Sequence, residues 1–429
     1  CNDDCGPFHC GARRKIKASK VAKLKFYRLI HYLDIIYYNT MSTGKLSDCF
    51  NINFKFLKVF ALWPGRESTR WFKLYSVVFL IINFIIYNIF LTLNLLATPL
   101  KIDLWFREVI FYFTEIAVTA KVCMIIFMRK KILEALNILD GKIFKDKDEE
   151  SKEIMTEHIS KYKTLWKALQ IWASLGYIFQ IICPVLFLAI FPNKIIELPI
   201  CKYYFLSDEM LSKYFAFWYF YQAAGIFGHM QYNVNIDTLI AGFILMAIAQ
   251  VKILNRKLVN LKSELNNEKE VLSNFRRYLK HYQVLKQYCS TVQDIISITM
   301  FVQFSMESMI ICVVLTGLTL PSTTETLMFM INYLVVVVME IFMPAWLCTY
   351  LAYESEKLAF ATYSSEWIPR SEGYKSTLKS FLQQSMAQIT FTGWRLFPLS
   401  LDTFVSIIKT AYSFFTLIRT VQDREIKTN

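Results

Sequence analysis

Long stretches without charged side chains constrain the fold of this chain more than any other feature. Residues 74–98, 168–191 and 214–236 contain no Asp, Glu, Lys or Arg. A helix needs roughly 20 predominantly apolar residues to cross the hydrocarbon core of a bilayer. Each of the three stretches is long enough, so each predicts a membrane-spanning helix.

Four more stretches are apolar and carry few charges. In chain order they are 108–128 with Glu108, Glu115 and Lys121, 295–320 with Glu307, 326–353 with Glu340, and 397–418 with Asp402 and Lys409. With 55% hydrophobic and 19% charged residues, the chain lacks the polar shell that a soluble protein with seven buried helices would need, since soluble domains carry about 25% charged residues. We therefore expect an all-α, seven-transmembrane helical bundle.

The Lys and Arg residues predict an orientation for this bundle. With a cytoplasmic amino terminus, 36 of the 48 basic residues fall on the cytoplasmic side and 8 on the other. The cytoplasmic segments are 1–73, 129–163, 252–286 and 356–379, and the opposite ones are 97–107, 191–213, 317–326 and 419–429. Cytoplasmic loops are enriched in Lys and Arg, which predicts a cytoplasmic amino terminus and an extracellular carboxyl terminus. The net charge of +14 is then a topology signal and requires no nucleic-acid partner.

The first forty residues differ from the rest of the chain. They begin with Cys1, contain a basic run from Arg13 to Arg28, and precede Met41. Two interpretations remain open for residues 1–40, an upstream gene-model extension or a disordered basic arm on the anionic inner leaflet. Residues 41–429 read as one seven-span channel domain, whose last span covers about residues 397–420.

The sequence lacks the motifs of catalysis. It has no phosphate loop, nucleophile elbow or zinc-binding pair, and its ten Cys and five His form no ligand-spaced cluster. We expect no enzyme activity, cofactor or metal site. Ionisable residues within spans are costly in lipid, so they serve either as polar contacts between helices or as an ion pathway. These residues are Glu115, Lys121, Asp237, Asp294, Glu307 and Glu340.

The last span carries a stripe of hydroxyl groups. Its members are Ser406, Thr410, Ser413, Thr416 and Thr420. Their spacing of three or four residues places them on one face of a helix. Such a stripe either faces water in a pore or hydrogen-bonds to neighbouring helices. One helix cannot enclose a pore, so the pore interpretation also requires several copies around an axis.

Aromatic residues gather where the spans are predicted to reach the outer surface. Dense runs occur at residues 105–113 and 203–221. Interfacial aromatic belts account for many of these residues, while runs on neighbouring spans also suit an apolar pocket for a small ligand. Both interpretations remain open on these residues alone.

The chain resembles the insect odorant receptor family over roughly residues 50–421. The residues that carry the resemblance are Leu62-Trp63-Pro64 before the first span, Leu198-Pro199 leading to Tyr214 and Gln222, and Leu399-Ser400-Leu401, Phe404, Ala411-Tyr412-Ser413, Phe415 and Leu417 at the end. The last span of the similar gustatory receptors usually starts with Thr-Tyr and ends with Gln-Phe, and neither pair occurs in this span.

The resemblance implies an odorant-tuned subunit of a heteromeric, ligand-gated cation channel. In that family the subunit forms a heterotetramer with an odorant co-receptor subunit, in the plasma membrane of olfactory sensory neurons. The last helix lines the pore, which assigns the hydroxyl stripe to it and puts the constriction near Thr416 and Thr420. Lys409 is then expected to point away from the axis or to lie in a water-filled vestibule.

The family's pocket for a small volatile ligand can be carried over residue by residue. It would comprise Val109, Tyr112, Phe113, Gly176, Gln180, Phe217, Tyr221, Met330 and Tyr333. Recognition in such a pocket rests on shape and dispersion, with a few polar groups. A gustatory-type receptor channel and, less well supported, a small-molecule transporter remain as alternatives.

Overall fold

The structure is a computed structural model that describes residues 45–65, 69–99, 102–145, 148–182, 184–186, 198–261, 268–319, 324–365 and 367–428. Residues Cys1–Ile52 and Asn53–Asn429 form two units, and each is described by itself. The interpretation of residues 1–40 as an extension or an arm lies outside the described residues. The first unit contains a 3₁₀ helix, η2 (Leu46–Phe50), and α2 (Asn51–Val59) follows it in the chain.

The described residues contain seven helices long and apolar enough to cross a membrane, as the sequence predicts. They span Arg70–Ala97, Leu104–Phe127, Glu149–Leu186, Phe215–Asn260, Glu268–Gly317, Leu327–Tyr363 and Leu401–Thr420. All seven predicted spans are therefore present in chain order. Several helices continue well beyond the length that a bilayer requires.

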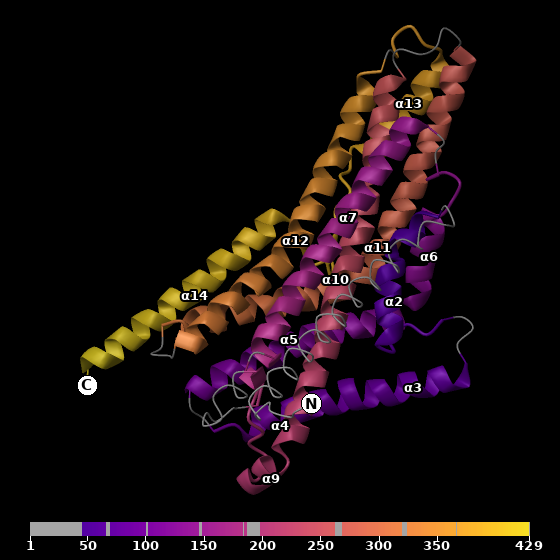
Figure 1. Cartoon of the computed structure of the whole chain (residues 1–429). Helices are drawn as coiled ribbons and strands as arrows, with labels where there is room; N and C mark the ends of the chain where they lie inside the picture. The colour runs from indigo at the N-terminus through magenta and orange to yellow at the C-terminus, as the bar shows by residue number, and fades with distance from the viewer. Residues whose placement is uncertain are drawn as a thin grey trace, which may run out of the picture. The chain divides into compact units, whose positions relative to one another are not determined.

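The central helix of the second unit is α10 (Phe215–Asn260), and residues 234–251 of it are all buried. It packs against α5 (Ile102–Phe127), α7 (Glu149–Tyr177), α11 (Glu268–Gly317) and α12 (Thr324–Tyr363). A helix that is apolar on all sides must be covered on all sides. Residues 238–251 carry no charged side chain, which allows this central position (Figure 1).

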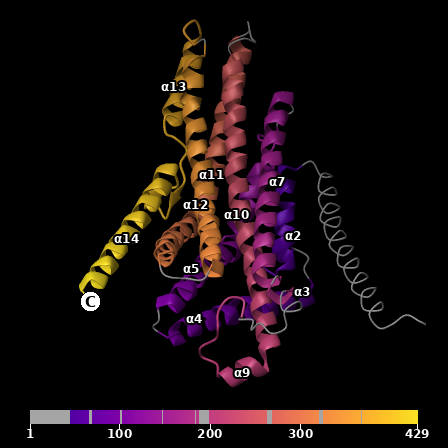
Figure 2. The same cartoon turned by 60° about the vertical axis from the view of Figure 1, so that its left-hand side comes forward.

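Three helices extend together at one end of the second unit. The helices α10, α11 and α12 run side by side, and α13 (Glu372–Ser385) packs against α11 and α12 at that end (Figures 1 and 2). The amphipathic patterns of residues 252–286 and of 354–385, the second interrupted at Pro369, predict helical extensions of this kind. Their buried contacts include Phe275 with Tyr374, whose ring centroids are 5.1 Å apart, and Tyr282 with Phe381 at 5.2 Å.

Two spans contain π-helical segments that the sequence did not predict. The segment η3 (Ile81–Ile86) joins α3 (Arg70–Leu80) to α4 (Tyr87–Ala97). The segment η4 (Ile178–Ile182) continues α7. Such segments occur frequently at functional sites. Between α5 and α7 lies α6 (Arg129–Leu139), while the short α9 (Asp208–Lys213) precedes α10.

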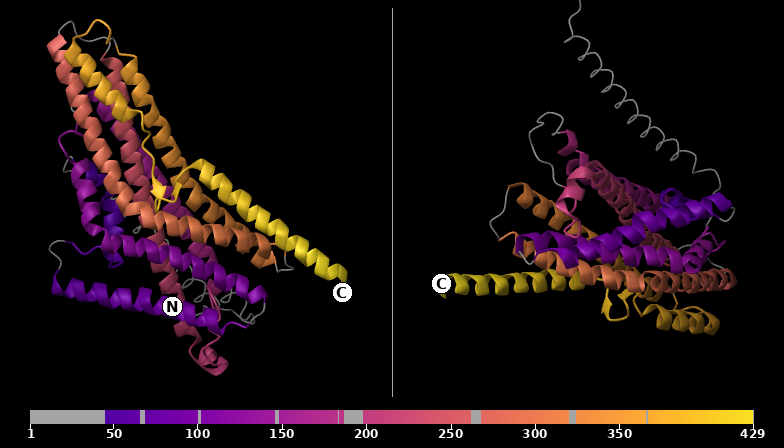
Figure 3. Two further views of the ribbon diagram at one scale, coloured as in Figure 1. Left: turned by 180° about the vertical axis from the view of Figure 1, so that it is seen from behind. Right: turned by 90° about the horizontal axis from the view of Figure 1, so that it is seen from below.

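A small hairpin leads into the last helix. Its strands β1 (Thr392–Gly393) and β2 (Phe397–Pro398) pair antiparallel and lie against α11 (Figure 3). Gln293 on α11 donates to the carbonyl of Thr392 at 2.9 Å and accepts from its amide at 2.8 Å. The hairpin therefore fixes the start of α14 (Leu401–Thr428), whose far end leaves the other helices (Figures 1 and 2).

The packing of α10 against α4 depends on Gly225. A Cβ atom added there would overlap the ring of Tyr87, a side chain that is 1% exposed. A Cβ atom added at Gly228, one turn along the same helix, would meet nothing within 4 Å. The two glycines are both buried, so substitutions at these two positions can be compared directly.

We predict opposite effects for Gly225→Ala and Gly228→Ala. The first overpacks the contact with Tyr87 and destabilises the protein by about 1–3 kcal/mol. The second improves helix propensity by up to about 1 kcal/mol and leaves stability unchanged or raised. Thermal melting of the purified protein in detergent measures both, and equal melting temperatures for the two variants would contradict the packing.

Candidate functional site

An aromatic cluster joins α4, α5, α10 and the segment before α9. Its buried members are Tyr87, Leu91, Phe111, Leu198, Ile200, Cys201, Tyr203 and Leu211, and half-buried rings that pack against it include Phe90, Phe205, Trp218, Tyr219, Tyr221, Phe329 and Tyr333. Aromatic side chains bury large areas and prefer tilted or edge-on contacts. The rings of Tyr203 and Trp218 lie almost edge-on, with an interplanar angle of 83° and ring centroids 5.6 Å apart.

Polar contacts fasten residues 198–206 onto this cluster. Gln222 accepts from the amide of Ile200 at 3.1 Å and donates to the carbonyl of Cys201 at 2.9 Å. Asn94 accepts from the amide of Tyr204 at 2.8 Å and donates to Glu108 at 2.9 Å. Burial, and secondarily the nearby Glu108 carboxyl, raises the pKa of the Cys201 thiol well above its ordinary value, so this cysteine remains an unreactive thiol.

Two of the predicted pocket residues pack against the aromatic cluster, and a third is buried. Tyr221 and Tyr333 pack against it, and Met330 is 6% exposed. The hydroxyl of Tyr221 donates to the carbonyl of Ile82 in η3 at 3.2 Å. The hydroxyl of Tyr333 forms a short hydrogen bond with that of Thr114 on α5. The cluster therefore brings together rings from α10 and α12 and a hydroxyl from α5.

The other predicted pocket residues are placed less centrally. Val109, Tyr112 and Phe113 are half-buried on α5. Gly176 is half-buried, with no atom within 4 Å of a Cβ placed there. Gln180 donates to the carbonyl of Pro199 at 3.4 Å. Phe217 is 60% exposed, so its ring faces away from the core of the bundle.

Sequence reasoning did not select Phe111, Phe329, Tyr87 or Trp218. The ring of Phe111 lies 5.8 Å from that of Phe329 and 6.1 Å from that of Tyr333. Phe111 belongs to the aromatic run at residues 105–113. The sequence does not give the rotation of this helix about its axis, so it could not show which residues of the run face inward. The indole N–H of Trp218 has no hydrogen-bond partner among the described residues, which leaves it as a donor.

The hydroxyl stripe of α14 lies opposite the face that contacts the bundle. Phe404 packs on Phe342 of α12, with ring centroids 5.5 Å apart, and Ala411 is 2% exposed. Because successive residues are rotated by about 100°, Ser413 lies roughly 180° around the helix from Phe404. Ser406, Thr410, Ser413 and Thr420 are exposed, and Thr416 is half-buried.

Each stripe hydroxyl bonds to its own helix. Ser406, Thr410, Ser413, Thr416 and Thr420 each donate to a carbonyl three or four residues earlier, at 2.8–2.9 Å. Within the described residues, the stripe is therefore not used to hold α14 to its own bundle. Lys409 is exposed and lies about 140° from Phe404 by the same helical rotation, on the side of the stripe. This placement disfavours a side chain directed away from the stripe.

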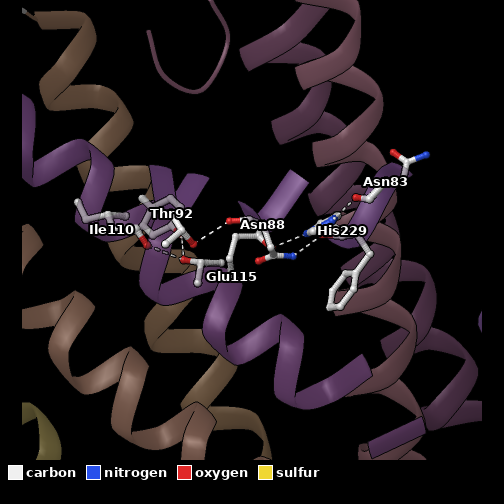
Figure 4. A network of polar contacts seen from close by, with 9 residues as sticks. Asn83, Asn88, Thr92, Ile110, Glu115 and His229 are labelled. Carbon is white, nitrogen blue, oxygen red and sulfur yellow. Dashed lines mark hydrogen bonds and ion pairs between the residues drawn. The ribbon is translucent and has the colours of Figure 1, made fainter. Parts of the chain in front are cut away.

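Ionisable residues inside the bundle form contacts between helices. His229 on α10 contacts the carboxyl of Glu115 on α5 through Nδ1, and its Nε2 lies 2.8 Å from the carbonyl of Asn83 in η3 (Figure 4). Lys121 on α5 lies 2.7 Å from Asp237 on α10. These pairings agree with the prediction of polar contacts between helices.

The comparisons with known proteins identify the family. A family model described as 7tm odorant receptor matches residues 101–412. The chain belongs to this family. Odorant receptor 42a of Drosophila melanogaster is 27% identical over 188 residues, covering 44% of this chain and 46% of the relative. Odorant receptor 22a of the same species is 28% identical over 176 residues, covering 41% and 44%. The matched segment thus spans slightly less than half the length of these relatives.

Solved structures show the same fold. The chain is similar to the insect olfactory receptor OR5 from Machilis hrabei in complex with eugenol, with a TM-score of 0.77, 17% identity, and coverage of 87% of this chain and 97% of the other. A second solved structure of OR5 from Machilis hrabei gives a TM-score of 0.76 at 16% identity, with coverage of 86% of this chain and 97% of the other. The chain is therefore a multi-pass membrane protein of the odorant receptor family, and this family consists of receptors rather than enzymes.

We predict that Asp237→Asn strongly destabilises this odorant receptor. Lys121 is 0% exposed, and the substitution removes the carboxylate that contacts its ammonium group at 2.7 Å; breaking such a buried pair costs up to about 3–5 kcal/mol. Asp294→Asn is the control, because Asp294 forms an ion pair with Lys131 in which the Lys131 side chain is 43% exposed and the Asp294 side chain 47%. Such exposed pairs contribute about 0–1 kcal/mol to stability. Melting temperature and surface yield report both, and similar losses for the two variants would count against the buried pair.

Proposed function

We propose that the chain is the odorant-tuned subunit of a heteromeric, ligand-gated cation channel. The exposed hydroxyl stripe of α14 is the observation that carries the proposal. It faces away from the chain's own bundle, with its hydroxyls bonded only within the helix among the described residues. A polar face on a membrane helix suits a water-filled path, and closing such a path requires further copies of α14 around an axis.

The proposed assembly is a heterotetramer with an odorant co-receptor subunit, in the plasma membrane of olfactory sensory neurons. The amino terminus lies in the cytoplasm and the carboxyl terminus outside, which the 36 Lys and Arg residues of the cytoplasmic segments support. The family match favours this function over a gustatory-type channel or a transporter. The constriction is proposed near Thr416 and Thr420, and Lys409 lies in a wet vestibule.

The proposed ligand is a small volatile molecule held among aromatic rings. The site comprises Val109, Tyr112, Phe113, Gly176, Gln180, Phe217, Tyr221, Met330 and Tyr333, of which Tyr221 and Tyr333 pack on the aromatic cluster. The cluster adds apolar surface and the unpaired indole N–H of Trp218. The olfactory receptor OR5 of similar fold has been solved in complex with eugenol, which is consistent with a ligand of this size. The ligand opens the channel only through tighter binding to the open state.

Recording of odour-evoked currents tests the function. Cells that express this chain together with an odorant co-receptor subunit should show cation currents in response to a panel of volatile compounds. Cells that express the co-receptor alone provide the control and should show a different odour ranking or none. Absence of evoked current across a broad panel, with the chain at the cell surface, would overturn the proposal.

We predict that Tyr221→Ala changes the ranking of active odorants. The substitution removes a ring that packs on the aromatic cluster, and a truncated aromatic alters the dispersion contacts that select ligands by shape. Tyr214→Ala is the matched control at the N-cap of the same helix, because that ring is 48% exposed. Dose–response curves for several odorants measure the ranking, and an unchanged ranking in Tyr221→Ala would contradict the placement of the site.

A further inference from the structure

A buried polar cluster joins four helices of the bundle. Lys121 on α5 lies 2.7 Å from Asp237 on α10 and donates to Asn233 of the same helix at 2.5 Å. The Asn233 amide in turn donates to Glu340 on α12 at 2.7 Å. Each of these side chains therefore has a partner of opposite charge or suitable polarity.

Glu307 on α11 is the exception. The residue is 2% exposed, and neither of its carboxylate oxygens has a hydrogen-bond partner among the described residues. The charged groups that act on it are Glu340, Lys121 and Asp237. Its carboxyl group thus faces the cluster without a donor to stabilise a negative charge.

The charges of this cluster do not balance. If all were ionised, the one ammonium group of Lys121 would face three carboxylates, which leaves two net negative charges inside a membrane span. A buried carboxylate without partners is very costly, and two neighbouring carboxylates resist simultaneous ionisation. The described residues contain no group of three or more His, Cys, Asp or Glu placed to hold a metal ion. A proton, unlike a metal ion, binds to a single carboxylate and needs no set of ligating side chains.

We propose that Glu307 is a proton-binding site, in which a neutral Glu307 carboxylic acid pairs with the Glu340 carboxylate. The proton comes from solvent water and adds to one carboxylate oxygen of Glu307, whose O–H then donates to Glu340. Glu340 is the acceptor because it is less buried and already receives the Asn233 amide. Glu307 is the acid because it is buried and receives no donor.

The other ionisable groups around α11 leave this balance unchanged. Glu115 and His229 contact each other, and the pair is neutral overall whether the proton lies on the imidazole or on the carboxyl group. On α6, Lys131 pairs with Asp294 near the surface. The Asp, Glu, Lys and Arg residues on α13, on the hairpin turn and on α14 up to Arg419 are exposed or half-exposed, namely Glu372, Lys375, Lys379, Arg395, Asp402, Lys409 and Arg419.

Infrared spectroscopy of the purified full chain tests the site independently of channel function. At neutral pH, in a detergent without ester groups, the wild type should show the C=O band of a protonated carboxylic acid, which shifts in D₂O. Glu307→Gln should lose the intensity of one carboxylic acid from this band. It should also melt within about 2 °C of the wild type, since Gln replaces a neutral acid of the same shape.

Matched variants assign the band. Glu340→Gln and Glu115→Gln remove other buried carboxyl groups and should retain it, and Glu307→Asp should retain it at a shifted frequency. A wild type without the band, a Glu307→Gln protein that keeps its full intensity or fails to fold, or its loss in Glu340→Gln would overturn the proposal. A rise in melting temperature with Na⁺ at constant ionic strength, absent in Glu307→Gln, would assign a cation instead and also overturn it.

Discussion

The burial of α10 is the constraint on which the rest of the bundle depends. Residues 234–251 are covered on every side, so each polar side chain on this helix needs a partner from a neighbour. Asn53 donates to Thr238 at 2.8 Å, the Trp166 indole donates to Asn235 at 3.2 Å, and His281 lies 2.9 Å from Gln250. These contacts fix the rotation of the surrounding helices about their axes, which nonspecific apolar packing would leave free.

The last helix shows the opposite situation. Its contact with the chain's own bundle is limited to one face, around Phe404 and Ala411, and large apolar side chains beside the stripe, such as Phe414 and Leu417, are 53% and 59% exposed. The apolar side chains beside the stripe can face lipid, but the hydroxyl groups of the stripe find no hydrogen-bond partner there. The combination suits a helix whose polar face is covered by water and whose flanks meet other subunits or lipid.

Composition and charge distribution were sufficient to predict the seven spans and the continuous helices beyond the membrane, because both rest on local hydrophobic patterns. A single sequence could not show which ionisable residues pair with one another. Glu115, Lys121, Asp237, Glu307 and Glu340 stood out as charges within spans, but His229 as the partner of Glu115 required the arrangement of α5 and α10.

The same limit applies to the candidate ligand site. The aromatic run on α5 was visible in the sequence, yet only the rotation of the helix shows Phe111 buried against Phe329. On α10, Tyr221 packs on the aromatic cluster while Phe217, four residues earlier, is 60% exposed. The π-helical segment Ile81–Ile86 lay in a charge-free stretch, which gave no sign of a change in helical winding.

Cysteine accessibility along α14 tests the central claim most directly. Single cysteines replace Ser406, Thr410 and Ser413, or, as controls on the other face, Phe404 and Ala411, in the chain expressed with a co-receptor subunit. A charged, membrane-impermeant thiol reagent is applied to odour-gated channels. Block of the current is expected at the three stripe positions and no block at the two controls. Block at the controls with none along the stripe, or no block at any position, would contradict a pore lined by α14.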